Sequence, residues 1–202
     1  MSIFRSYLPL LQQVEGGFQI NPKDDGNYNS LDQLVGTMYG ISARFYEGVI
    51  GRPPSIGDMK AITKSQAAEL YRVYFWDKQM ASEINSQAIA NTVIDHQVNA
   101  GNGIQVAQEL LNSRFGFSLA TDNQNGKNTL YALNSVDVGK FVTLFNEKRK
   151  AHYNTRSNSN EFADGWIDRL SKFTVEYQKP ISMATIGAIA TVGFLFYKFY
   201  LK

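Results

Sequence analysis

Apolar residues in the N-terminal part of the chain recur at helical spacing and are followed by a polar, glycine-rich stretch. Segment 3–14 has this spacing, and Gly16–Gly17 then supplies residues that commonly end helices. Segment 21–40 is rich in Asn, Asp and Gly, which is typical of a loop or a short irregular hairpin. The pattern therefore predicts that Glu15 lies at the C-terminal end of a helix, in front of a long loop.

Helical spacing resumes after this loop and continues through most of the chain. Thr63 and Gln66 form a capping-box pattern that marks the start of one helix. Segment 161–178 carries an apolar stripe typical of an amphipathic helix. Long stretches that alternate apolar and polar residues are missing, so the sequence predicts a mainly α fold. The other helices are expected at 42–49, 86–99, 104–112, 129–133 and 138–153.

The C-terminal end differs from the rest of the chain in charge and hydrophobicity. Segment 181–197 contains no charged residue, and apolar residues continue to Leu201 with only Lys198 between them. This length matches a bilayer crossing, and the bordering aromatic and basic residues suit a membrane interface. We therefore expect one domain over 1–178 and a transmembrane helix over 181–201, with a buried helix of the domain as the alternative.

Composition narrows the classes of function. Of the 202 residues, 44% are hydrophobic, which is enough for one core with at most a small extra lobe. The formal net charge of +2 is too small to create a strong field, which argues against nucleic acid as a partner. The absence of cysteine excludes disulfides, cysteine nucleophiles and cysteine-rich zinc sites.

The remaining potential metal ligands form no recognisable motif. His96 and His152 are the only histidines and lie far apart in the sequence, so neither a metal nor a cofactor is expected. Segment 122–126 resembles a calcium loop only weakly and is expected to be a turn. Asp95 lies within an apolar helix, where we expect a structural hydrogen bond to a loop amide rather than a catalytic role.

Glu15 is the first candidate for a catalytic acid. Hydrolysis of a glycosidic bond needs a carboxylic acid that stays protonated near neutral pH and a second group that handles water or positive charge. The helix C-terminus and the neighbouring Phe18 would both raise the pKa of Glu15, which is the direction a general acid needs. Asp24, Asp25 and Thr37 follow in the loop as candidates for the second role. For these residues alone, an ordinary helix end remains the alternative.

Several blocks of the sequence form an ordered series. It begins with segments 14–18 (VEGGF) and 36–42 (GTMYGIS), which have Asn21, Pro22 and Asp24 between them. The series resembles glycoside hydrolase family 108, the phage-type N-acetylmuramidases. Later blocks follow in the family's order at 71–77 and 93–101, and blocks within 104–178 resemble the peptidoglycan-binding region that accompanies the muramidase motif.

The resemblance implies a lysozyme-like helical fold with peptidoglycan as the substrate. It implies cleavage of the glycan strand between N-acetylmuramic acid and N-acetylglucosamine, with Glu15 as the catalytic acid and no cofactor. The chain departs from the family's pattern by inserting Gly26–Leu34 between the aspartate and the threonine. The identity of the second catalytic group is therefore left open. Asp24 is preferred over Asp25 because it keeps the family's spacing from Glu15, and Thr37 is the further candidate.

Tyr39, Asp25 and Trp76 are the candidates for contact with the substrate. Tyr39 lies in the motif beside the presumed cleft, and Asp25 is the neighbour of Asp24. The ring of Trp76 would stack on a sugar face, and packing in the core is the alternative for it.

Two other functions are compatible with the same features. One is a lytic transglycosylase acting on the same bond, and the other is a non-catalytic wall-binding structural membrane protein. The N-terminus does not resemble a secretory signal peptide. With segment 181–201 as a single-pass anchor, the protein would be a membrane protein whose partners are peptidoglycan and the lipid bilayer. A phage virion membrane, or a phage lysis or infection step, would then bring it to the wall, and membrane orientation and oligomeric state are left open.

Overall fold

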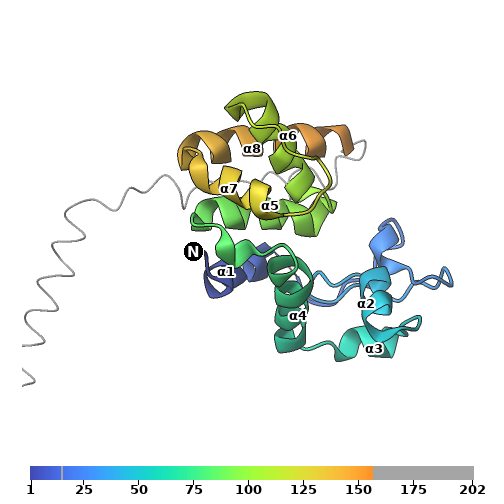
Figure 1. Ribbon diagram of the computed structural model, residues 1–202. Helices are drawn as coiled ribbons and strands as arrows, with labels where there is room; N and C mark the ends of the chain where they lie inside the picture. The colour runs from blue at the N-terminus through green and yellow to red at the C-terminus, as the bar shows by residue number, and fades with distance from the viewer. Residues whose placement is uncertain (15, 157–202) are drawn as a thin grey trace, which may run out of the picture.

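The computed structural model describes residues 1–14 and 16–156, which form eight α-helices joined by short turns and one long loop (Figure 1). These residues contain no β-strand, and their only β pairing consists of three isolated antiparallel bridges. The expectation of a mainly α fold is therefore confirmed. The helices are α1 (Phe4–Val14), α2 (Ala43–Ile50), α3 (Ile56–Ala61), α4 (Lys64–Tyr71), α5 (Gln87–Ala100), α6 (Gly103–Phe115), α7 (Lys127–Ser135) and α8 (Val138–Arg156).

Side-chain caps fix where several helices begin. Ser42 and Ser86 each accept a hydrogen bond from a backbone N–H in the first turn of α2 and α5. Thr63 and Gln66 form the predicted capping box at the start of α4. Helix α3 was not predicted, because its six residues are too few to show a period, and a capping box between Ser55 and Asp58 starts it.

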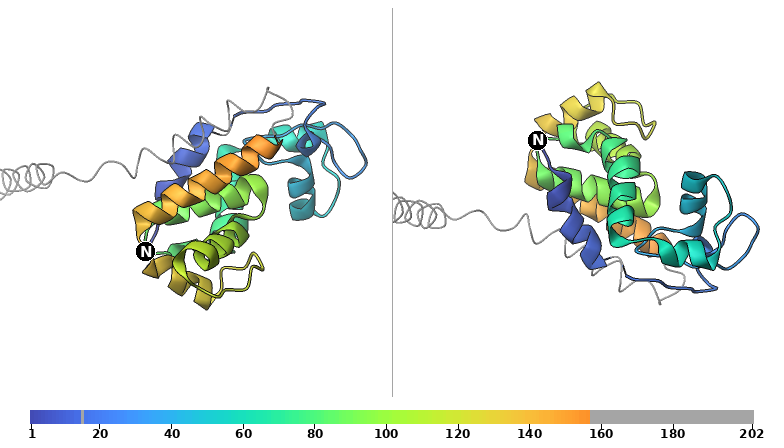
Figure 2. Two further views of the ribbon diagram at one scale, coloured as in Figure 1. Left: turned by 90° about the horizontal axis from the view of Figure 1, so that it is seen from above. Right: turned by 90° about the horizontal axis from the view of Figure 1, so that it is seen from below.

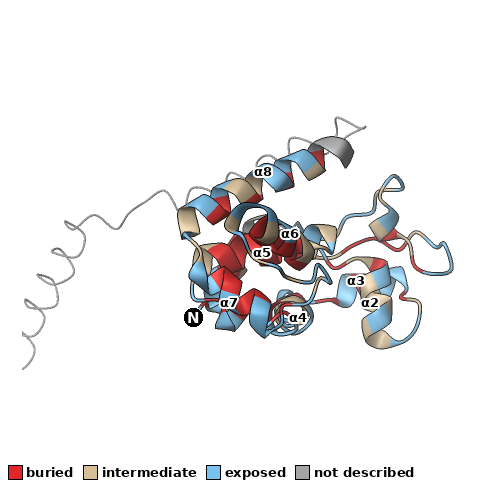
Figure 3. Cartoon of the chain, turned by 45° about the horizontal axis from the view of Figure 1, so that its top comes forward, coloured by how far each residue is buried: buried red, intermediate tan, exposed pale blue. Residues whose placement is uncertain are grey.

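Helix α5 forms the centre of the fold. Its residues from Ile89 to Gln97 are all buried, and α1, α6 and α8 pack around it (Figure 3). We call α1 and α5–α8 the helical part. Residues 16–62, with α2 and α3, form the front part, which lies at one end of the molecule with α4 between the two parts (Figures 1 and 2).

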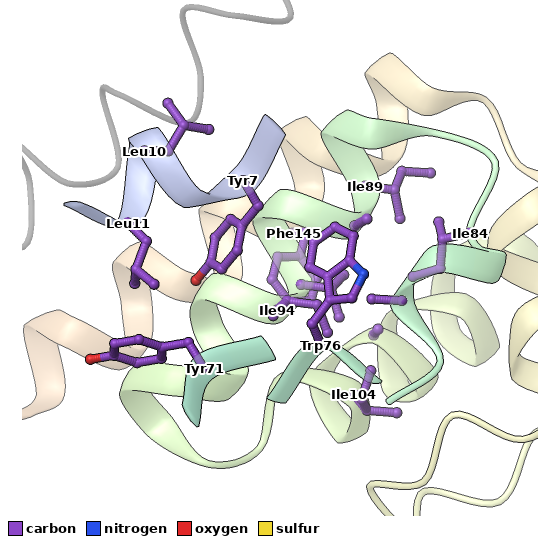
Figure 4. Close-up of a cluster of buried hydrophobic side chains, with 14 of the residues drawn as sticks. Tyr7, Leu10, Leu11, Tyr71, Trp76, Ile84, Ile89, Ile94, Ile104 and Phe145 are labelled. Atoms are coloured by element: carbon purple, nitrogen blue, oxygen red, sulfur yellow. The ribbon is translucent and has the colours of Figure 1, made fainter. Parts of the chain in front are cut away.

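An aromatic cluster joins α1 to the segment that follows α4. Arg72–Asp77 continues α4 as a π-helical turn and brings Trp76 under α1, where its ring stacks on Tyr7 at 5.6 Å between centroids (Figure 4). Phe4 meets the same indole edge-on at 5.8 Å. Stacked and edge-to-face rings of this kind bury large apolar areas, so the cluster holds α1 against the rest of the core.

A buried ion pair joins α5 to α8. Asp95 and Arg149 both have fully buried side chains, and Nη2 of Arg149 donates to a carboxylate oxygen of Asp95. The sequence predicted that a buried Asp95 would need a structural partner. The partner is a guanidinium group 54 positions away rather than a loop amide.

The membrane localisation predicted from the sequence is corrected. The predicted span 181–201 and the amphipathic segment 161–178 lie outside the described residues. Within the residues that are described, no helix has both the length and the apolar character needed to cross a bilayer. The longest, α8, has 19 residues but carries charged side chains such as Lys140, Glu147 and Lys150 along its length.

Candidate active site

Three cavities follow one another from α1 and α4 into the front part, and neighbouring cavities share residues. The α1–α4 cavity, of about 370 Å³, lies between Leu8 and Leu11 of one helix and Ala67 and Tyr71 of the other. Gly16 and Gly17 line it as well, and they also line the Asp24 cavity, of about 340 Å³. Glu15 lies outside the described residues, and the residue bonded to it, Gly16, lines both of these cavities.

Asp24 is held at the edge of the cavity that we name after it. Its Oδ1 accepts from the backbone N–H of Gly26 at 2.9 Å, which caps a short 3₁₀ turn, Asp25–Asn27. Its Oδ2 accepts from Nε2 of Gln19 at 3.2 Å. The two hydrogen bonds fix the orientation of a half-buried carboxyl group that lines the cavity.

Thr37 lines the same cavity from the opposite segment of the loop. Its backbone pairs with Gln19 through two hydrogen bonds of 2.9 Å. The residue is 8% exposed, and within the described part of the chain its hydroxyl has no hydrogen-bond partner. Buried hydroxyl groups are normally satisfied, so this one is suited to bind water or a substrate hydroxyl in the cavity.

Gly36 makes the approach of these two segments possible. Its φ is +89°, and a Cβ there would lie 2.7 Å from the carbonyl oxygen of Gln19 and 2.7 Å from the Phe18 ring. A residue with a side chain would therefore push the Gln19–Thr37 pairing apart.

Tyr39 lies in a tight turn and faces the α1–α4 cavity. Tyr39 and Gly40 both have positive φ, at 48° and 73°, and Met38 pairs with Ile41 on either side of them. The hydroxyl of Tyr71 donates to the Tyr39 carbonyl at 3.1 Å, and Nζ of Lys64 lies 5.9 Å from the centre of the Tyr39 ring. The turn thus holds an aromatic ring and a cation side by side at the cavity wall.

Asp25 is separated from its neighbour by the 3₁₀ turn. It is exposed and lines the third cavity, of about 620 Å³, whereas Asp24 lines the cavity that contains Thr37. Gly26 and Ser42 line both of these cavities, so they are adjacent. The third cavity is walled by the inserted loop and the start of α2, and we call it the loop cavity.

The segment that contains the residues lining these cavities is similar to a known protein family. Residues 8–101 match the family described as glycosyl hydrolase 108. This segment is therefore similar to the glycosyl hydrolase 108 family. The resemblance stated from the sequence motifs is therefore confirmed for residues 8–101, and so is the prediction of a glycosidase at the level of the family. The peptidoglycan-binding region expected within 104–178 stays a prediction. No curated protein matches the sequence significantly.

The fold is also found in a solved structure. SagA from Brucella abortus superposes with a TM-score of 0.72 and 22% sequence identity, over 86% of this chain and 92% of that one. At this identity the likeness shows a common fold. It extends past the glycosyl hydrolase 108 segment, so the helices after residue 101 are part of the shared architecture.

One residue predicted to contact the substrate does not line this site. Trp76 is 1% exposed, its ring is packed by Tyr7 and Phe4, and its Nε1 donates to Ser82 at 2.8 Å. The prediction is corrected, because an indole packed in this way joins α1 to the segment after α4 and offers no free face to a sugar.

Three residues at the site were not predicted. Gln19 orients Asp24, Ser42 lines two cavities, and Lys64 lines the α1–α4 cavity. Only Ser42 and Lys64 have a signal in the sequence, because both stand at predicted helix starts, and that signal indicates local structure rather than a site. No group of acidic or histidine side chains in the described part of the chain is arranged to hold a metal ion.

Proposed function

We propose that the protein hydrolyses the glycan strand of peptidoglycan between N-acetylmuramic acid and N-acetylglucosamine, with Glu15 as the general acid. The observation that carries the proposal is the meeting of Asp24, Thr37 and Gly16–Gly17 at one cavity. Residues 15–24 and 37 belong to separate parts of the family motif, and two of the proposed catalytic groups, Asp24 and Thr37, line this one cavity.

The proposed chemistry gives each group one task. Glu15 donates its proton to the bridging oxygen as the bond between that oxygen and the anomeric carbon breaks. A water molecule held by the Thr37 hydroxyl attacks the anomeric carbon, and the Asp24 carboxylate accepts the proton that this water releases. The hydrogen bonds from Gly26 and Gln19 hold Asp24 ready for this role.

The α1–α4 cavity supplies a binding surface for the sugar on the other side of Gly16 and Gly17. It combines the apolar side chains of Leu8 and Leu11 with the ring of Tyr39, a combination that suits the apolar face and the acetyl methyl group of an N-acetyl sugar. A role in phage lysis or infection rests on the family resemblance and stays a prediction.

The test is digestion of purified cell wall by the full chain, with mass spectrometry of the released fragments. We expect fragments ending in reducing N-acetylmuramic acid, and we expect the Glu15→Gln variant to clear wall suspensions at least about a hundredfold more slowly. The Thr37→Ala variant should be slow and Thr37→Ser close to wild type, because serine retains the hydroxyl.

Other products would redirect or overturn the proposal. Fragments ending in 1,6-anhydro-N-acetylmuramic acid would identify a lytic transglycosylase, in which the sugar's own hydroxyl replaces water. Reducing N-acetylglucosamine ends would refute the assigned bond, and full activity of Glu15→Gln would refute the assigned acid.

A further inference from the structure

The inserted segment Gly26–Leu34 is an ordered part of the front of the molecule. Asn29, which is fully buried, makes four side-chain hydrogen bonds: Nδ2 donates to Gln33 at 2.9 Å and to the Pro54 carbonyl at 3.1 Å, and Oδ1 accepts from the N–H groups of Leu31 and Gln33. Ser30 donates its N–H and hydroxyl to the Glu47 carboxylate on α2. The insertion therefore has a defined shape.

The shape of the insertion creates the loop cavity. Tyr28 from the insertion lines it, and the hydroxyl of that residue donates to the Pro22 carbonyl at 3.1 Å, which fixes the ring across the loop. The cavity is adjacent to the Asp24 cavity, because Gly26 and Ser42 line both. A substrate held at Asp24 therefore has a second, larger space directly beside it.

Charged side chains of both signs face this space without pairing. Asp25 and Asp32 line the cavity together with Arg44, and within the described residues no ion pair involves any of the three. All three residues are exposed. Opposite charges kept apart around one cavity suit a ligand that itself carries both signs.

The position of Arg44 supports a role in binding. It is the second residue of α2, where the helix dipole disfavours a positive charge. No acidic residue stands in this first turn to offset it. Within α2, Glu47 attracts the Arg44 charge but forms no ion pair with it. The guanidinium group at the cavity suits a carboxylate.

We propose that the loop cavity binds the stem peptide of peptidoglycan, with Arg44 binding a carboxylate and Asp25 and Asp32 binding the free amino group of the diamino acid. This rests on the proposed function, because it places the peptide of the muramic acid residue beside the cleaved bond. The insertion then makes the enzyme prefer glycan strands that still carry their peptides.

The first experiment compares two substrates with the full chain. One is glycan strands with stem peptides, and the other is the same strands after an amidase has removed the peptides. We expect Arg44→Gln and Asp32→Asn each to lower kcat/KM on the peptide-bearing strands about tenfold, which is the size of a lost charge-assisted contact. On the stripped strands, kcat/KM of both variants should stay within about twofold of the wild-type value. Asparagine tolerates the positive φ of 54° at position 32, so the loop keeps its form. Arg114→Gln, an exposed change at the end of α6, is the control and should alter neither.

The second experiment measures binding without catalysis. A synthetic stem tetrapeptide with a free side-chain amino group is titrated into the wild-type chain and the variants by calorimetry or NMR. Acetylation of that amino group should weaken binding to the wild type and to Arg44→Gln. It should have little further effect on a variant carrying both Asp25→Asn and Asp32→Asn.

The results separate this inference from the proposed function. Equal losses on both strands, or no loss on either, would overturn the peptide assignment while leaving the hydrolase intact. If the wild type cut neither strand, the proposed function would fail, and the tetrapeptide titration would still decide what the loop cavity binds. Tetrapeptide binding that none of these substitutions weakens would refute the inference.

Discussion

Aspartate and arginine serve opposite purposes in the two parts of the molecule. In the helical part, Asp95 and Arg149 are fully buried and form an ion pair, so their charges neutralise each other between α5 and α8. In the front part, Asp25, Asp32 and Arg44 line one open cavity without pairing. The contrast shows that the charges of the core hold helices together, and those of the front are available to a ligand.

The largest effect should come from removing a front carboxylate that faces the Asp24 cavity. We expect Asp24→Asn to lower kcat by about 10²- to 10⁴-fold, since asparagine can still accept the Gly26 hydrogen bond but cannot take a proton from water. Wall clearing and thermal unfolding are measured together. Asp25→Asn is the matched control, with a loss of a few-fold at most on stripped strands. If Asp24→Asn and Asp25→Asn lowered kcat on those strands to a similar extent, the catalytic role could not be assigned to Asp24 alone.

A core carboxylate should behave in the opposite way. Asp95→Leu leaves the Arg149 guanidinium buried without its counter-charge, which should reduce the free energy of unfolding by about 3–5 kcal/mol. Activity per folded molecule should stay unchanged, as Asp95 lines none of the three cavities. The double variant Asp95→Leu with Arg149→Met should recover much of the loss in urea unfolding. If the double variant stayed as unstable as Asp95→Leu, the loss of stability in Asp95→Leu could not be ascribed to the unpaired charge of Arg149.

A substitution at Gly36 should lower both stability and activity. Gly36→Ala should lower stability by about 1–3 kcal/mol, because alanine is strained at this positive φ and its Cβ meets the Gln19 carbonyl. Activity should fall as well, since Thr37 is displaced. Gly57→Ala in α3 is the control, where the added Cβ has only an ordinary 3.5 Å contact with Ser55. Unchanged activity of a folded Gly36→Ala enzyme would argue against a role for Thr37.

The smallest effect concerns the anchor of the insertion and depends on pH. Hydrogen bonds from the Ser30 side chain and N–H lower the pKa of Glu47 below its ordinary value of 4.5. The carboxylate therefore stabilises the loop above that value, and the contribution disappears as the pH falls through the lowered pKa. Glu47→Gln should speed amide hydrogen exchange in residues 29–36 at neutral pH. The difference from wild type should shrink in acid, and a difference that persisted there would exclude ionisation as its cause.

Local patterns predicted most of the helical part. Spacing of apolar residues located α5 and α8, and Ser86 and the Thr63–Gln66 pair marked helix starts that the structure retains. The residues of each such pattern lie within a few positions of one another, so a short segment of sequence is enough to predict the helix. The sequence also showed that the insertion departs from the family pattern.

The anchors of the insertion could not be predicted. Asn29 reaches a carbonyl 25 positions away at Pro54, and Ser30 reaches Glu47 over 17 positions. Such hydrogen bonds depend on where α2 and α3 lie in space, and the spacing of apolar residues within a short segment does not predict that position. The misassignment of Trp76 has the same origin, because an indole in an aromatic run has the same local pattern in a core as in a cleft.

The pair of glycines after Glu15 has a consequence for how a polymer is engaged. A Cβ added at Gly16 or Gly17 would meet no atom of the described residues within 4 Å, so packing against these residues does not demand glycine there. These two glycines line both the α1–α4 and the Asp24 cavity and add no side chain of their own to either wall. A glycan strand that occupied both cavities would be bound on either side of the two glycines, an arrangement that suits a cut within a strand rather than at its end.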